Sequence, residues 1–129
     1  MHGWPELVQV VARAFNDLPV EERVRCAVLA YNYGEAAAID YLGPAHGLPK
    51  AISGHNQYGH WGPRGYHGEV VIAIGFTEER LQDTFEEVTP VARVTSQYAM
   101  PEEANLTIHV CRKPRKPLEE VWAKLRWLG

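Results

Sequence analysis

The sequence predicts an α/β fold, a three-layer sandwich in which a mostly parallel sheet of about five strands carries helices on both faces. Short apolar runs rich in β-branched residues recur along the chain, as in Val24–Tyr31 and Glu69–Phe76. Segments with helical periodicity alternate with these runs. The chain has 129 residues, of which 46% are hydrophobic, so we expect a single domain over residues 1–129 with a substantial core.

The first half of the chain is predicted to hold two helices and two strands. Proline suits the first turn of a helix, so Trp4-Pro5-Glu6 opens one, and apolar residues follow at helical spacing. The continuous apolar run Val24–Tyr31 is typical of a buried central strand. In order, we expect a helix from Trp4 to Leu18, a strand over Val24–Tyr31, a helix over Gly34–Leu42 and a strand over Lys50–Ser53.

The second half is predicted to add three strands and two helices. Thr77 is a suitable N-cap for the helix that follows the strand Glu69–Phe76. The link from Val94 to Leu106 shows no helical pattern, so we expect the last strand to be antiparallel and at an edge. The remaining elements are a helix over Glu78–Phe85, strands over Val88–Val94 and Leu106–Cys111, and a closing helix over Pro117–Leu128.

Charge and hydropathy exclude several classes. The formal net charge is −3, which argues against a duplex nucleic-acid binder. The basic run from Arg112 to Lys116 is interrupted by proline, and we interpret it as a solvated turn. The apolar run Val70–Phe76 is too short to span a bilayer, and no signal-peptide pattern precedes Glu6.

Two cysteines, Cys26 and Cys111, each lie inside an apolar run. This position predicts buried, inert thiols. A disulfide between them requires that their strands be neighbours. No cysteine spacing predicts a zinc knuckle.

The candidate site lies at the carboxyl ends of the predicted strands, where open α/β sheets bind ligands. Three segments are expected to meet there: the turn after Tyr31, the loop Gly54–Gly68 and the segment Gly75–Thr77. The loop is crowded with polar and aromatic side chains. The candidate ligand-binding residues are Asn32, Tyr33, Gly34, Glu35, His55, Asn56, Tyr58, Trp61 and Arg64.

Several of these residues have a structural explanation as well as a functional one. Gly34 at a helix start can hold an anion through free N–H groups, but neither G-x-G-x-x-G nor a Walker lysine is present. Glu35 in the first turn complements the helix dipole. Tyr58 and Trp61 can stack on a sugar ring or a base, or fold inward as a small core of the loop.

Neither a metal centre nor a catalytic group is predicted. Four histidines lie in or near the loop, namely His46, His55, His60 and His67. None is paired at i, i+4 spacing and no cysteine is nearby, so we expect no metal and no cofactor. No nucleophile or acid–base pair stands out, and three carboxylates are interpreted as solvated charges: Asp40, Glu86 and Glu87.

A family resemblance extends over nearly the whole chain. It is carried by WPELVQVVARAFNDLPVEER, NYGEAAAIDYLGP, GLPKAISGHNQY, WGPRGYHGEVVIAIG and HVCRKPRKPL. These segments resemble the soluble C-terminal region of bacterial family 39 membrane glycosyltransferases, which are related to the dolichyl-phosphate-mannose protein mannosyltransferases. The SGHN-x-Y…WGP signature is moderately specific for this family.

The resemblance implies a context rather than a catalytic residue. In that family, catalysis belongs to a multi-helix membrane portion that uses a polyprenyl-phosphate sugar donor. The resemblance therefore implies that this chain is a non-catalytic soluble domain on the extracytoplasmic side of the membrane. Its partner would be a membrane-embedded glycosyltransferase portion. The role of the chain would be recognition of a sugar or peptide acceptor, or structural support.

Two alternatives stay open at this stage. One is a stand-alone small-molecule-binding α/β protein, or a metal-assisted hydrolase that uses His55, His60 and Glu35. The other is a structural module that packs through an exposed apolar patch of tryptophans on the terminal helices, namely Trp4, Trp122 and Trp127. The sequence leaves the oligomeric state open.

Overall fold

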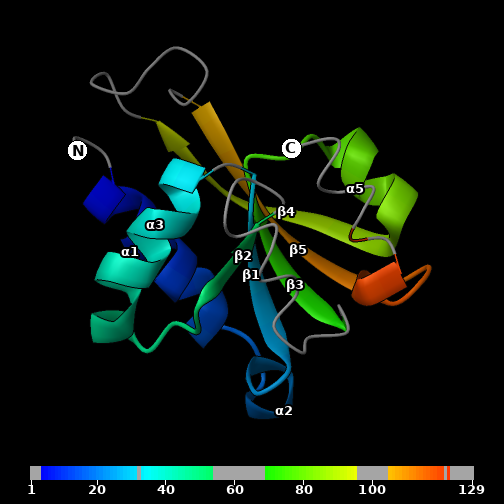
Figure 1. The fold of residues 1–129 in the computed structure, drawn as a ribbon, viewed down its shortest axis with the longest axis horizontal. Helices are drawn as coiled ribbons and strands as arrows, with labels where there is room; N and C mark the ends of the chain where they lie inside the picture. The colour runs from blue at the N-terminus through cyan, green and yellow to red at the C-terminus, as the bar shows by residue number, and fades with distance from the viewer. Residues whose placement is uncertain (1–3, 32, 54–68, 96–104, 121, 123–129) are drawn as a thin grey trace.

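The computed structural model describes residues 4–31, 33–53, 69–95, 105–120 and 122, and they form a mixed α/β fold around an open sheet (Figure 1). The helices are α1 (Trp4–Asn16), α2 (Val20–Arg23), α3 (Tyr33–Leu42) and α5 (Glu78–Thr84), with a 3-10 helix, η1 (Gly43–His46). The strands are β1 (Cys26–Ala30), β2 (Ala51–Ser53), β3 (Val70–Ile74), β4 (Phe85–Thr95) and β5 (Asn105–Pro114).

The sheet is parallel at one end and antiparallel at the other. Within the described ranges, five strands form one sheet in the order β2–β1–β3–β5–β4. β1 runs parallel to both neighbours, with Leu29 opposite Ile52 of β2 and Ala73 of β3. β5 is antiparallel to β3 and to β4, with Cys111 opposite Val71 and Val88. The expected parallel sheet is therefore confirmed only for β2–β1–β3.

The last strand is antiparallel, as predicted, but its predicted edge position is wrong. β5 lies between β3 and β4, and β4 takes the edge. The long ladder between β4 and β5, from Phe85 opposite Pro114 to Thr95 opposite Asn105, explains this order. A strand of this length hydrogen-bonds to β3 on one side and β4 on the other, so most of the backbone groups of β5 find partners inside the sheet.

The central strands are buried on both faces. Every residue of β1 and β3 is buried, and alternate residues belong to two different apolar clusters. The first cluster joins Val28 and Ile72 to α1 and α3, and the second joins Leu29 and Ala73 to Leu81 of α5. In Figure 1, α1 and α3 lie next to each other and apart from α5. Burial on both faces is the reason these strands are continuous apolar runs.

The first three predicted helices are confirmed close to their expected ends, as α1, α3 and α5. α1 buries Leu7, Val8 and Val11, which recur at helical spacing. Thr77 is the N-cap of α5, because its hydroxyl oxygen accepts a hydrogen bond from the backbone N–H of Arg80 at 3.3 Å. The short helices α2 and η1 were not predicted, since four residues are too few to show a period.

The closing helix is described only in part, as residues 118–120 and 122. Trp122 is 7% exposed and packs in the second cluster with Leu118, so the predicted exposed tryptophan patch is wrong for this residue. Trp127 and the side chain of Trp4 lie outside the described part of the structure. Among the helices that are described, none has the length and apolarity needed to cross a membrane.

Both cysteines are free and buried, as predicted. Cys26 belongs to the first apolar cluster and Cys111 to the second, on strands that β3 separates. The disulfide that the sequence left open is therefore absent between them. Burial raises the pKa of each thiol to about 12.

Candidate functional site

The described part of the predicted site begins at the turn between β1 and α3. Glu35, in the first turn of α3, is 1% exposed. Its Oε1 atom accepts a hydrogen bond from the backbone N–H of Tyr31 at 3.0 Å. The same N–H also donates to the carbonyl oxygen of Ile74 at 3.1 Å. Glu35 therefore connects the start of α3 to the ends of β1 and β3.

Gly75 lies directly against this carboxylate. It follows β3 with φ +84°, and a Cβ atom there would lie 3.0 Å from Oε2 of Glu35. Next to it, the rings of Tyr31 and Phe76 meet edge to face with centroids 5.4 Å apart. The predicted meeting of the segments after Tyr31 and around Gly75 is thus confirmed. The geometry gives Glu35 a structural role in holding the two strand ends together.

The other predicted ligand-binding residues are placed as follows. Gly34 is the second residue of α3 and is partly buried. The backbone of Tyr33 begins the same helix, and its side chain is not described. The remaining six lie outside the described residues: Asn32, His55, Asn56, Tyr58, Trp61 and Arg64.

A cleft opens on the other side of Gly75, between the end of β3 and the start of β5. Its volume is about 360 Å³, within the range of small-molecule sites. The backbone N–H of Gly75 donates to the carbonyl oxygen of Thr107 at 3.3 Å and holds the two strand ends together. The lining residues are Gly75, Phe76, Thr77, Glu78, Leu106, Thr107 and His109. The predicted segment Gly75–Thr77 therefore forms one wall of this cleft.

His109 is the most unusual group in the cleft. It lies on β5 opposite Ala73, is 3% exposed, and its Nδ1 atom has no hydrogen-bond partner among the described residues. Burial lowers the pKa of the imidazole, and the nearby carboxylate of Glu78 opposes this shift only in part. The ring is therefore uncharged at neutral pH, with one donor nitrogen and one acceptor nitrogen.

His109, Glu78 and Thr107 were not predicted as site residues. The sequence feature that could have indicated His109 is its position inside the apolar run LTIHVC. His109 lies two residues before Cys111 and therefore on the same face of the strand. A polar residue in an otherwise buried strand is more informative than an exposed one. Finding the cleft also required knowing that β5 pairs with β3, which no local pattern in the sequence indicates.

Asp40 is not the solvated charge that the sequence suggested. Its Oδ1 atom accepts a hydrogen bond from the backbone N–H of Ala51 at 2.7 Å, so it connects α3 to the start of β2. Glu86 and Glu87 lie exposed on β4, as expected, and Glu87 pairs with Lys113 at 3.0 Å. None of these three carboxylates lines the cleft.

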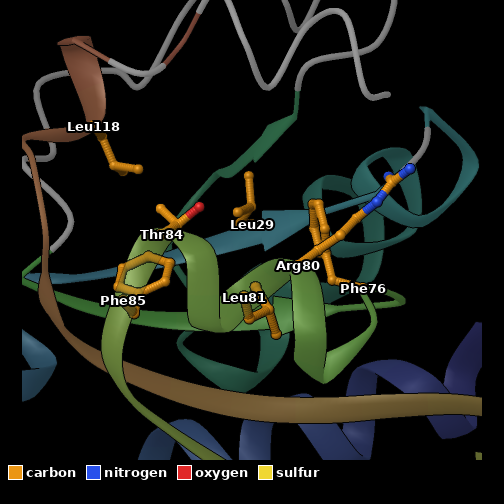
Figure 2. Close-up of a pocket in the computed structure, with 7 residues that line it drawn as sticks. All are labelled: Leu29, Phe76, Arg80, Leu81, Thr84, Phe85 and Leu118. Atoms are coloured by element: carbon orange, nitrogen blue, oxygen red, sulfur yellow. The ribbon is translucent and has the colours of Figure 1, made fainter.

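A second, much smaller cavity lies between α5 and the sheet (Figure 2). Its volume is about 20 Å³, which is room for roughly one water molecule. Figure 2 shows the side chains of Leu29, Phe76, Leu81 and Phe85 around it. This space is a packing gap in the second apolar cluster, too small for a ligand.

The described residues contain no group of three histidine, cysteine, aspartate or glutamate side chains that could hold a metal ion. No family model, curated protein or solved structure compared with this chain matches it. The function is therefore inferred from the chain's own residues and geometry.

Proposed function

We propose that this chain is a non-catalytic recognition domain that binds a polar ligand in the cleft between β3 and β5. The observation that carries the proposal is the buried imidazole of His109 and its unpartnered Nδ1 atom. An unsatisfied buried polar atom lowers stability by about 1–3 kcal/mol, so such groups are rare and call for an explanation. A ligand group that reached this nitrogen from the cleft would offset this loss.

Neighbouring groups support a recognition role. Phe76 provides an aromatic wall, while Thr77, Glu78 and Thr107 provide polar groups around one opening. The exposed lining of the cleft is more polar than apolar, which suits a polar ligand. One other described residue has a buried unpartnered nitrogen, Nε of Arg23, but Arg23 lies on α2 and does not line the cleft.

We also propose the biological context that the family resemblance implies. The chain would lie on the extracytoplasmic side of a membrane, beside a membrane-embedded glycosyltransferase portion, and its ligand would be a sugar or peptide acceptor. The segments that carry the resemblance support the link to the cleft. WGPRGYHGEVVIAIG ends at Gly75, and HVCRKPRKPL begins at His109.

We also propose that the fold is a three-layer sandwich, with helices on both faces of the sheet. α1 and α3 would form one outer layer, and α5 with the closing helix the other. The two separate apolar clusters, which share no residue of β1 or β3, support this arrangement.

The test is the substitution His109→Leu in the full chain. Leucine has a similar volume and no polar atom, so we expect the free energy of unfolding to rise by about 1 kcal/mol. Binding of hexoses, followed by NMR shifts of Gly75, Phe76 and Thr107 amides, should weaken at least about tenfold. The rise in stability is measured by urea unfolding.

The matched control is His46→Leu. His46 lies exposed in η1, away from the cleft, so this change should alter neither hexose binding nor stability by more than about 0.5 kcal/mol. If His109→Leu left binding unchanged, or if hexose shifts clustered away from the cleft, the proposed site would be wrong.

A further inference from the structure

Among the described residues, the lining of the cleft includes a carboxylate and no cationic side chain. Its described lining contains two ionisable side chains, Glu78 and His109, and no lysine or arginine. The imidazole is uncharged at neutral pH, so the carboxylate of Glu78 sets the sign of the local charge, and Glu79 follows it in the first turn of α5. The next residue, Arg80, lines the small interior cavity instead (Figure 2).

The two ionisable side chains of the described lining offer acceptor atoms, and the hydroxyls of Thr77 and Thr107 can donate as well as accept. The backbone N–H of Gly75 is used in its bond to Thr107, and the N–H of Tyr31 is used by Glu35 and Ile74. The strand ends therefore offer neither of these amides to an anion, unlike a phosphate-binding turn. Glu78 can only accept, and a neutral imidazole has one acceptor nitrogen.

The ring of Phe76 adds a third feature. It lines the cleft and is partly exposed. An aromatic face attracts a cation through its quadrupole. Carboxylate, imidazole and aromatic ring together match a group that is positively charged and rich in donors.

We propose that the cleft recognises a protonated primary amino group on its ligand, with Glu78 and His109 as acceptors, and discriminates against phosphate and carboxylate groups. This inference rests on the proposed function and names the chemical class of the ligand. An amino sugar and the free amine of a peptide share this chemistry.

The test compares three probes with one sugar ring and different substituents at carbon 6: 6-amino-6-deoxy-D-glucose, D-glucose and D-glucose 6-phosphate. Dissociation constants are measured at pH 7 on the full chain by NMR titration. The amine should bind about three- to fivefold tighter than glucose, the gain from a solvent-accessible ion pair. The phosphate should bind more weakly than glucose.

Two exposed neighbours provide the variant and its control. Glu78→Gln should abolish the preference for the amine over glucose, because it removes the charge and keeps the shape. Glu79→Gln should retain that preference, because Glu79 does not line the cleft. Both residues are exposed, so neither change disturbs the core.

The outcomes separate the two proposals. The proposal that the ligand carries a positive charge would be wrong if glucose 6-phosphate bound as tightly as glucose or tighter, or if the preference for the amine survived Glu78→Gln. Either result would leave the proposed recognition site in place. If none of the three probes shifted the NMR signals of the cleft amides, and short peptides with a free amine also failed to do so, both the proposed function and the proposed ligand class would be wrong.

Discussion

At the residue scale, two carboxylates with structural partners contrast with the buried imidazole of His109. Glu35 accepts from the N–H of Tyr31, and Asp40 accepts from the N–H of Ala51. Both carboxylates stabilise connections between helices and strands. His109 differs, because its Nδ1 atom is buried and unpartnered among the described residues. That difference is what separates a candidate ligand contact from a structural carboxylate.

Two glycines allow the contact between Gly75 and Glu35 to be tested. Gly75 and Gly47 have nearly the same backbone conformation, with φ values of +84° and +80°. A Cβ atom at Gly47 meets nothing within 4 Å, whereas one at Gly75 would lie 3.0 Å from Oε2 of Glu35. We expect Gly47→Ala to lower the free energy of unfolding by about 1 kcal/mol.

Gly75→Ala should lower it by about 2–4 kcal/mol, because steric overlap adds to the same backbone strain. Urea unfolding of the two variants measures the difference directly. Equal losses would mean that the carboxylate of Glu35 moves aside freely and does not hold the strand ends.

At the element scale, the basic run at the end of β5 is exposed at Lys113, Arg115 and Lys116, as predicted, but Arg112 is half-buried in an ion pair. The guanidinium of Arg112 donates two hydrogen bonds to the carboxylate of Glu22, at 2.8 and 2.9 Å. Arg115 donates from Nε to the carbonyl oxygen of Gln82 at 3.0 Å. The first of these links connects α2 to β5, and the second connects the end of β5 to α5. Arg112 and Arg115 thus join helices to the sheet, while Lys113 pairs with Glu87 of the neighbouring strand β4.

The link between α2 and β5 predicts a pH-dependent contribution to stability. The hydrogen bonds from Arg112 hold the pKa of Glu22 below its ordinary value. Because the folded pKa is depressed, the contribution is present above the ordinary glutamate pKa of about 4.3 and is lost as pH falls below it. Glu22→Gln should therefore lower the free energy of unfolding by about 1 kcal/mol at pH 7, and by much less at pH 3.

The control for this prediction is Lys113→Gln. Lys113 pairs with Glu87, but both side chains are largely exposed, so its removal should change stability by less than about 0.5 kcal/mol at pH 7. Chemical unfolding of the wild type and both variants at the two pH values provides the measurement. A loss for Glu22→Gln that did not diminish at pH 3 would contradict the ion-pair explanation.

At the scale of the whole molecule, one sheet separates two apolar clusters, and each cluster contains one free cysteine. Cys26 reports on the cluster of α1 and α3, and Cys111 on the cluster of α5. Burial raises both thiol pKa values to about 12, so neither thiolate is populated in the folded chain at neutral pH. The two thiols therefore monitor the two sides of the sheet independently.

We expect both thiols to react with a thiol reagent only through global unfolding, at equal rates. Since β1 and β3 contribute residues to both clusters, neither side should open alone. The measurement is reaction with Ellman's reagent in Cys26→Ala and Cys111→Ala variants across a urea series. Faster labelling of Cys111 would mean that the α5 side opens as a separate unit.

Local physical chemistry determined much of the secondary structure directly from the sequence. The apolar spacing of Leu7, Val8 and Val11 predicts α1, the continuous apolar runs predict β1 and β3, and Thr77 predicts the start of α5. These features depend on residues within a few positions of one another, so their pattern can be seen in the sequence itself.

Only the tertiary structure decided the order of the strands and the composition of the cleft. The pairing of Ala73 with His109, the contact of Gly75 with Glu35 and the link from Glu22 to Arg112 join residues that are far apart in the chain. Such contacts are selected by the packing of the whole sheet, because a strand pairs where its apolar faces and backbone groups are best satisfied. That is why the sequence predicted that the segments after β1 and β3 lie close together, but not the buried histidine beside the cleft.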